Sequence, residues 1–302
     1  MDSATRRGVE GAAQGQGGVI SRRQLAALGV DRDAVAREVR AGRWAGHGAA
    51  TLAVHRGPLP QEALRWRAVW EVGHAVAVLD GVSSLLAAGL TGFEEGMLHV
   101  SVTRNSRCPA VDGVRIHRVR RVADEHRTPG SVPRTPAAVA AVRGAGWAVS
   151  DRQAALVLAM SVQQRLVTGP QLVSAVRAVR TRGRRPFIRQ IVHDIVAGAQ
   201  SLLELDFMAL ARAWGLPEPE RQVVRHGPRG RVYLDVRWAG SRLVVEIDGS
   251  GHRMGLAVSS DNLRQNEVTL GNNRVLRFDL LALRLCENEV MLQVRRGLGD
   301  RV

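Results

Sequence analysis

The period of the hydrophobic positions changes along the last third of the chain and predicts a sheet flanked by helices. Apolar residues recur at helical spacing over 201–214, then alternate with polar ones in three successive segments. The predicted elements are a helix at 201–214, strands at 221–226, 231–238 and 243–248, a helix at about 261–270, a strand at 274–278 and a helix near 287–297. This αβββαβα order predicts a mixed sheet with helices on its faces, in a domain spanning 198–302.

The two central predicted strands carry three acidic residues. Glu246 and Asp248 are two positions apart on one strand, so they project to the same face. If residues 239–242 form a four-residue loop, Asp235 lies opposite Glu246 with Cβ atoms roughly 5 Å apart. A three-residue loop would shift the register by one position. Three carboxylates at the rim of a sheet repel one another, but they suit a hard cation such as Mg²⁺ or Mn²⁺.

The N-terminal pattern predicts a short helix, a tight turn, a second helix and a hairpin. Residues 1–17, rich in Gly, Ala and Gln, are expected to form a disordered tail. The elements over 18–56 follow the order of a winged helix-turn-helix. Three arginines on or near the second helix are the expected DNA contacts: Arg32, Arg37 and Arg40. The alternative is a structural module that only packs against its neighbour.

The middle of the chain is expected to hold a small α+β domain over 57–126, followed by a linker and helices over 127–197. Alternation predicts strands at Leu98–Thr103 and Val114–Val119. On an edge hairpin, the arginines around these strands would either follow a phosphate backbone or blunt the sheet edge. A second arginine-rich stretch, 177–189, is either a solvated linker or a phosphate-contacting arm that includes Arg182, Arg184 and Arg185.

Composition adds a strong positive charge to this picture. The 302 residues carry a formal net charge of +15, and every basic residue other than histidine is an arginine, because the sequence contains no lysine. Such an excess favours nucleic acid as partner, although arginine bias without a ligand is the alternative. No apolar stretch reaches the length of a membrane helix. Cys108 and Cys286 lack metal or redox spacing, which predicts buried free thiols in a reducing cytoplasm.

Two segments of the chain resemble known protein families. The segment 198–302 resembles the PD-(D/E)xK nuclease superfamily, and more narrowly an endonuclease-like domain of unknown function related to very-short-patch-repair endonucleases. Residues 18–122 more weakly resemble the winged-helix and following domain of abortive-infection antitoxin-like proteins of the AbiEi type. The nuclease resemblance rests on Glu204, Asp235, Val244 to Gly249, His252, Asp261 to Asn266 and Val275 to Phe278.

The nuclease resemblance implies the fold and chemistry of a metal-dependent endonuclease, which we expect to act on DNA. The winged helix and the arginine-rich stretches would hold a DNA duplex. Asp235 and Glu246 match the two metal ligands of the superfamily. Asp248 stands where the superfamily usually has a lysine, and this is the main departure from its pattern. Asp248 would hold a second ion or accept a proton from the attacking water. A non-catalytic DNA-binding regulator, or an antitoxin-like protein with a degenerate nuclease fold, is the competing interpretation.

Four further residues take roles only through this resemblance. Arg264 or Gln265 would contact the phosphate or the attacking water in place of the lysine. Glu204 matches the helix acid of the superfamily, or else only caps its helix. His252 would position a water or a phosphate, or else is simply an exposed loop residue. RNA processing is a third class of function, which the low aromatic content of 4% disfavours.

Overall fold

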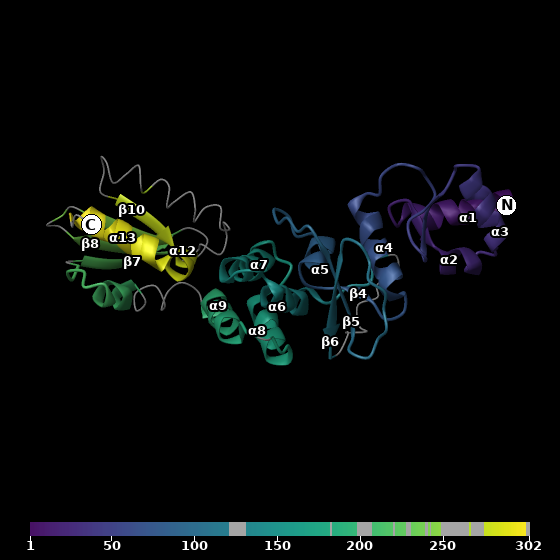
Figure 1. Cartoon of the computed structure of the whole chain (residues 1–302). Helices are drawn as coiled ribbons and strands as arrows, with labels where there is room; N and C mark the ends of the chain where they lie inside the picture. The colour runs from purple at the N-terminus through teal and green to yellow at the C-terminus, as the bar shows by residue number, and fades with distance from the viewer. Residues whose placement is uncertain are drawn as a thin grey trace. The chain divides into compact units, whose positions relative to one another are not determined.

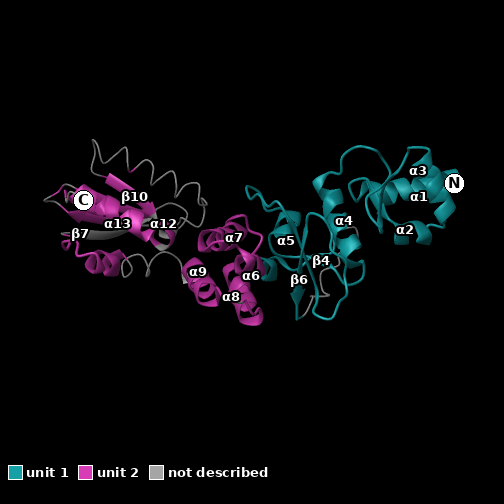
Figure 2. Ribbon diagram, viewed as in Figure 1, with its two compact units in different colours: residues 1–140 teal, residues 141–302 magenta. Residues whose placement is uncertain are grey.

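Helices and small sheets alternate along the chain, and the computed structural model is a mixed α+β protein (Figure 1). Two compact units comprise Met1–Ala140 and Ala141–Val302 (Figure 2). The finer division into four domains stays a prediction. The structure describes residues 1–120, 131–181, 183–197, 207–219, 221–227, 231–238, 241, 243–248, 266 and 275–299, with the backbone alone for 197, 221–227, 231–235, 248, 279–281 and 284.

The first unit begins with short elements around a small sheet. In chain order they are α1 (Ser3–Gln14), β1 (Val19–Ser21), α2 (Arg22–Ala27), α3 (Arg32–Arg40), β2 (Ala45–Gly46) and β3 (Thr51–Ala53). The strand order is β1-β3-β2, and both pairings are antiparallel. Helix α2 starts with the predicted capping box of Ser21 and Gln24, and Asp31 caps α3 through the backbone N–H of Ala34.

Helix α1 corrects the expectation that residues 1–17 form a disordered tail. Asp2 caps α1 by accepting hydrogen bonds from the backbone N–H groups of Ala4 and Thr5, at 2.8 and 2.9 Å. Val9 and Ala13, one helical turn apart, are buried in the core that α1 shares with β1, α2 and β3. The glycines of this segment lower its helix propensity, so the sequence looks unstructured, but tertiary packing outweighs that preference.

The rest of the first unit places two helices around a second three-stranded sheet of order β4-β5-β6. Its elements are α4 (Gln61–Gly73), β4 (Val78–Leu79), α5 (Gly81–Ala87), β5 (Leu98–Thr103) and β6 (Val114–Val119). The bounds of β5 and β6 agree with the prediction. Their pairing does not, because the two strands run parallel rather than as a hairpin. Residues 104–113 therefore return the chain to the starting end of β5.

One carboxylate on α4 fixes the turn between β2 and β3. Glu71 accepts hydrogen bonds from the backbone N–H groups of Ala49 and Ala50, at 2.9 and 3.0 Å, and from the hydroxyl of Thr51 at 2.6 Å. Gly48, at φ +140°, lies against the same carboxylate, which leaves no room for a Cβ. The turn is therefore held by a charged acceptor from a helix that follows it in sequence.

The second unit begins with four helices. They are α6 (Ala137–Trp147), α7 (Asp151–Gln163), α8 (Gly169–Ala178) and α9 (Arg185–Ala197). Ser150 caps α7 by accepting from the backbone N–H of Gln153, and Thr168 and Gln171 form the predicted capping box of α8. Helix α9 occupies the end of the arginine-rich stretch that was expected as a linker or an arm.

A four-stranded sheet of order β10-β9-β8-β7 forms the core of the C-terminal part. The elements are β7 (Arg221–Gly227), β8 (Arg231–Trp238), β9 (Leu243–Asp248), β10 (Val275–Asp279), α12 (Leu280–Leu285) and α13 (Glu287–Leu298). Strands β7, β8 and β9 pair antiparallel, and β10 joins β9 in parallel. One face of the sheet packs into a core with α13 and the helical residues 207–213. The mixed sheet agrees with the predicted element order.

Both cysteines, Cys108 and Cys286, are free, as the sequence predicts. Each is partly exposed, so their expected burial is wrong. Among the described residues, no helix is long and apolar enough to cross a membrane.

We predict that Glu71→Ala loosens the β2–β3 turn, because the Ala49 and Ala50 N–H groups lose a charged acceptor. Loss of such bonds costs about 2 kcal/mol, which corresponds to roughly 30-fold faster amide exchange at these two positions. Hydrogen-exchange mass spectrometry of the peptides around residues 47–51 measures this change. Glu62→Ala, an exposed carboxylate on the same helix, is the matched control. Equal exchange in both variants would contradict the assigned role of Glu71.

Candidate active site

The backbone register of β8 and β9 is the one that a four-residue loop predicts. Trp238 pairs with Leu243, and Asp235 lies opposite Glu246. The buried residues of β9 are Leu243, Val245 and Ile247, so the alternation of the strand turns Glu246 to the opposite face of the sheet. The predicted pairing of the two acidic positions is therefore confirmed at the level of the backbone.

The register also adds a fourth acidic position beside the three that the sequence predicts. On β10, Asp279 pairs with Asp248, which in turn pairs with Tyr233 of β8. Acidic positions thus occupy three neighbouring strands, at ladder pairs two positions apart. Of these four residues, the described side chain is that of Glu246, whose relative exposure is 36%. Solvent can therefore reach the acidic positions of the sheet at the Glu246 carboxylate.

Arg277 is the cationic neighbour of Glu246, and the sequence reasoning assigned it no role. It pairs with Glu246 in the parallel ladder of β10 and β9. Its Nε donates a hydrogen bond to Oε2 of Glu246 at 2.9 Å. The Arg277 side chain is 63% exposed, and such a solvated ion pair contributes at most about 1 kcal/mol. The contact neutralises the carboxylate without locking it in place.

Asn266 fixes the backbone of Arg277 at the outer edge of the sheet. Its side-chain amide donates to the Arg277 carbonyl oxygen at 2.8 Å and accepts from the Arg277 N–H at 2.9 Å. Asn266 is 2% exposed, so both bonds are shielded from water. The amide replaces the hydrogen bonds that a further strand would supply, because β10 lies at the edge of the sheet. Arg277 is therefore held by its main chain, while its guanidinium extends into solvent.

The acidic positions offer the donor set of a hard divalent cation. Carboxylate oxygens are the preferred protein ligands of Mg²⁺, and Asp235 and Glu246 lie on facing positions of adjacent strands. Within the part of the chain whose side chains are described, no group of three His, Cys, Asp or Glu side chains is placed to hold a metal. The side chains of Asp235 and Asp248 lie outside that part, so the fit rests on register and donor chemistry.

Several predicted site residues lie outside the described residues. They are Glu204, His252, Arg264 and Gln265. The predicted helix at 261–270 is described at Asn266 alone, which is helical. The roles assigned to these residues through the family resemblance stay predictions.

The predicted DNA-contacting arginines of the first unit are accessible. Arg32, Arg37 and Arg40 are all exposed on α3, while Glu38 faces the interior. Arg43 donates to the carboxylate of Glu38, and this hydrogen bond holds the pKa of Glu38 below its usual range. Glu38 is thus paired with Arg43, and the Nε of Arg40 donates to the carbonyl oxygen of Ala36 at 3.4 Å.

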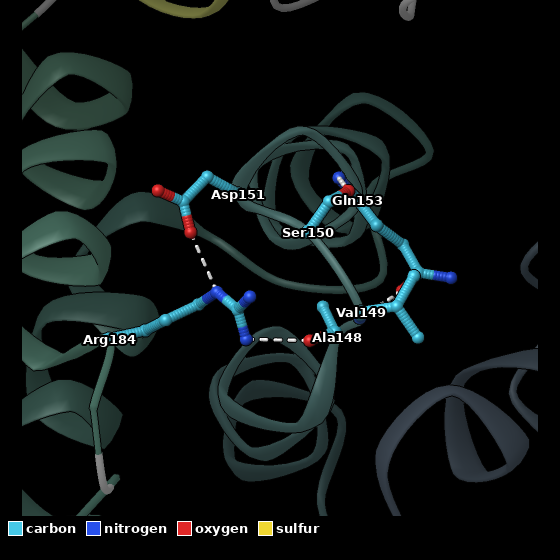
Figure 3. Close-up of polar contacts among 6 residues, drawn as sticks. All are labelled: Ala148, Val149, Ser150, Asp151, Gln153 and Arg184. Carbon is cyan, nitrogen blue, oxygen red and sulfur yellow. Dashed lines mark hydrogen bonds and ion pairs between the residues drawn. The ribbon is translucent and has the colours of Figure 1, made fainter.

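The arginines between α8 and α9 behave differently from the expected arm. The Arg184 Nε donates to Oδ1 of Asp151 at 2.7 Å, and its Nη1 donates to the carbonyl oxygen of Ala148 at 2.6 Å (Figure 3). Arg184 thus ties the start of α9 to the start of α7, next to the Gln153 side chain that accepts from the Val149 N–H. Arg184 therefore has an internal partner that the sequence did not predict, and its role as a DNA contact stays a prediction.

The two neighbours of Arg184 give no support for a phosphate-contacting arm. Arg185 is the first residue of α9, and its Nε is buried. Arg182 lies outside the described residues. Arg185 as a whole is partly exposed, so its role as a DNA contact stays a prediction.

A hollow of about 450 Å³ lies between α8 and α9, away from the acidic positions. Its lining is largely valine, including Val176 and Val192, and Arg177 and Arg189 also contribute. Its lining contains no carboxylate, cysteine or hydroxyl group. His193 also lines the hollow and is of a type that can act as a general base, but the lining residues include no nucleophile. The acidic positions of the sheet are therefore the better candidate for metal-dependent chemistry.

The comparisons with known proteins leave the family open. No family model matches the chain, and no curated protein matches it. The resemblances to very-short-patch-repair-like endonucleases and to AbiEi-type antitoxins therefore stay predictions.

We predict that Asn266→Ala releases the edge of β10, because the buried N–H and carbonyl of Arg277 lose their partners. The expected cost is about 1–3 kcal/mol, so the Arg277 amide exchanges roughly 10- to 100-fold faster. Asn266→Asp keeps the acceptor for the N–H but loses the donor, and we expect an intermediate rate. Hydrogen exchange of the 275–279 segment measures both variants, with exposed Asn288→Ala as control. Unchanged exchange in Asn266→Ala would contradict this role.

Proposed function

We propose that the chain is a metal-dependent endonuclease that hydrolyses phosphodiester bonds of DNA. The observation that carries the proposal is the β8–β9 register, which sets Asp235 opposite Glu246 with Asp248 two positions further along. Neighbouring carboxylates on one face of a sheet repel one another and destabilise the fold unless a cation or a proton is bound between them. The mixed four-stranded sheet with a parallel edge strand is compatible with a PD-(D/E)xK-like domain.

The proposed chemistry assigns a separate task to each acidic residue. Asp235 and Glu246 would hold Mg²⁺ or Mn²⁺, which when bound favours ionisation of a water and neutralises charge on the phosphate. In the hydrolytic step, the water oxygen bonds to phosphorus while the bond from phosphorus to the ester oxygen breaks. Asp248 would accept the proton from the water, and the leaving oxygen takes a proton from solvent.

The N-terminal elements supply a proposed means of holding DNA. The order α1-β1-α2-α3-β2-β3, with a sheet of order β1-β3-β2, is compatible with a winged helix. Helix α3 follows the turn after α2, in the place of a recognition helix, and it exposes Arg32, Arg37 and Arg40. The net charge of +15 favours association with a polyanion. We therefore propose double-stranded DNA as the partner.

Two observations favour a second candidate, a DNA-binding regulator without catalysis. Asp248 occupies the position where the superfamily has a lysine, and no lysine exists elsewhere in the chain. The Glu246 carboxylate is already neutralised by Arg277. A regulator would bind DNA through α3 without a metal-dependent step, so metal binding separates the two candidates.

We predict that the wild-type protein cleaves DNA with Mg²⁺ or Mn²⁺ and that the Asp235→Asn, Glu246→Gln double variant does not. The variant removes two anionic ligands, so it should lose site-specific Mn²⁺ binding in calorimetry and at least about 1,000-fold in cleavage. Plasmid, nicked and mismatched duplexes serve as substrates.

Glu289→Gln, an exposed carboxylate in α13, is the matched control and should behave as wild type. If the wild type takes up no Mn²⁺ and its activity equals that of the double variant, the nuclease proposal fails. DNA binding without metal uptake would then support the regulator.

We predict that replacing Arg32, Arg37 and Arg40 together with Gln weakens DNA binding. Each lost phosphate contact lowers the slope of log affinity against log salt by about 0.9, so the triple variant should lose about 2 to 3 in slope. Fluorescence anisotropy of a labelled duplex over a salt series measures this. Arg6→Gln with Arg7→Gln, two exposed charges on α1, provides the control for general charge loss. An equal loss per charge in both variants would remove α3 as the recognition helix.

A further inference from the structure

We propose that Arg277 is the phosphate-binding cation of the candidate site and that it forms an ion pair with Glu246 when no metal is bound. The inference rests on the proposed nuclease function and deepens it, since it names the group that takes the place of the missing lysine. The sequence places Arg277 in a stretch that matches the nuclease family but assigns it no role, because its position beside Glu246 depends on the parallel pairing of β10 with β9.

The placement of Arg277 follows from three contacts of described residues. The ladder sets Arg277 opposite Glu246, on the face away from the buried Leu276 and Phe278. Asn266 holds the N–H and the carbonyl of Arg277, so the position of its Cα is determined by the edge of the sheet. The guanidinium then reaches the carboxylate of Glu246, with 2.9 Å between Nε and Oε2.

A divalent cation can displace Arg277 from its ion pair with Glu246. Both side chains are solvent-accessible, at 63% and 36%, so the ion pair is weak enough for a divalent cation to displace. A cation that binds Glu246 releases the guanidinium within reach of any phosphate bound to the same cation. Without metal, Arg277 neutralises one acid of a repelling group, which lowers the cost of keeping the acids together.

An arginine is suited both to pairing with Glu246 and to binding a phosphate. The described contact uses Nε alone, while the guanidinium has five N–H donors in a planar fork. Such a fork binds phosphate oxygens in a bidentate manner, which an ammonium group cannot do. Arg277 takes no part in making or breaking bonds. It orients the phosphate and offsets its charge while water attacks.

The test uses the full chain with Arg277→Gln, Arg277→Lys and the control Arg212→Gln. Arg212 is exposed on the helical segment 207–213, which packs through Ala211 against the opposite face of the sheet. Calorimetry measures Mn²⁺ affinity, and plasmid cleavage is followed at saturating Mn²⁺. We expect Arg277→Gln to bind Mn²⁺ about two- to fivefold more tightly, because its competitor is gone. The same variant should cleave at least about 100-fold more slowly.

The opposite signs of these two effects exclude a merely structural role, because a damaged site would lose metal affinity and activity together. Arg277→Lys should recover part of the cleavage, and Arg212→Gln should match the wild type in both measurements. If Arg277→Gln cleaves as fast as wild type, or binds Mn²⁺ more weakly, the role of Arg277 is overturned while the nuclease proposal stands. If the wild type neither binds Mn²⁺ nor cleaves, both proposals fall.

Discussion

The pairing register of β8 and β9 is the constraint on which the candidate site depends. A slip of one residue would exchange the two faces of a strand, so it would bring Val245 and Ile247 to the acidic face and carry Glu246 into the core. Burial of each such aliphatic side chain is worth about 1.5–3 kcal/mol, and an unpaired buried carboxylate costs more. Burial of the apolar side chains therefore determines the register that brings the acidic positions together. Its free energy offsets the repulsion between their carboxylates.

Much of the local structure could be predicted because it follows from short-range rules. The bounds of β5, β6, β8 and β9 agree with the alternation of the sequence, and the capping residues Ser21, Asp31 and Thr168 mark real helix starts. The facing of Asp235 and Glu246 followed once a four-residue loop was assumed, since the loop length determines the partners along both strands. These features depend on neighbours in sequence.

The failures concern contacts between distant segments. Helix α1 was missed because its glycines weaken the local signal, while the burial of Val9 and Ala13 comes from packing on later elements. The parallel pairing of β5 and β6 was missed because alternation does not reveal strand direction. Arg277 escaped notice for a related reason, since its contact with Glu246 requires the order of β9 and β10. The contact of Arg184 with Asp151 was not predicted, because Asp151 lies on another helix.

The hydrogen bonds that Glu71 accepts from the turn between β2 and β3 affect how the first unit responds to a mechanical force. A hairpin held by its own pairing alone could pivot, but here the backbone of residues 49 and 50 is hydrogen-bonded to α4. Val19 and Ala53 of the first sheet share a core with Trp66 and Val69 of the same helix. A force applied to the β2–β3 hairpin would therefore be transmitted to α4 through these hydrogen bonds and this shared core.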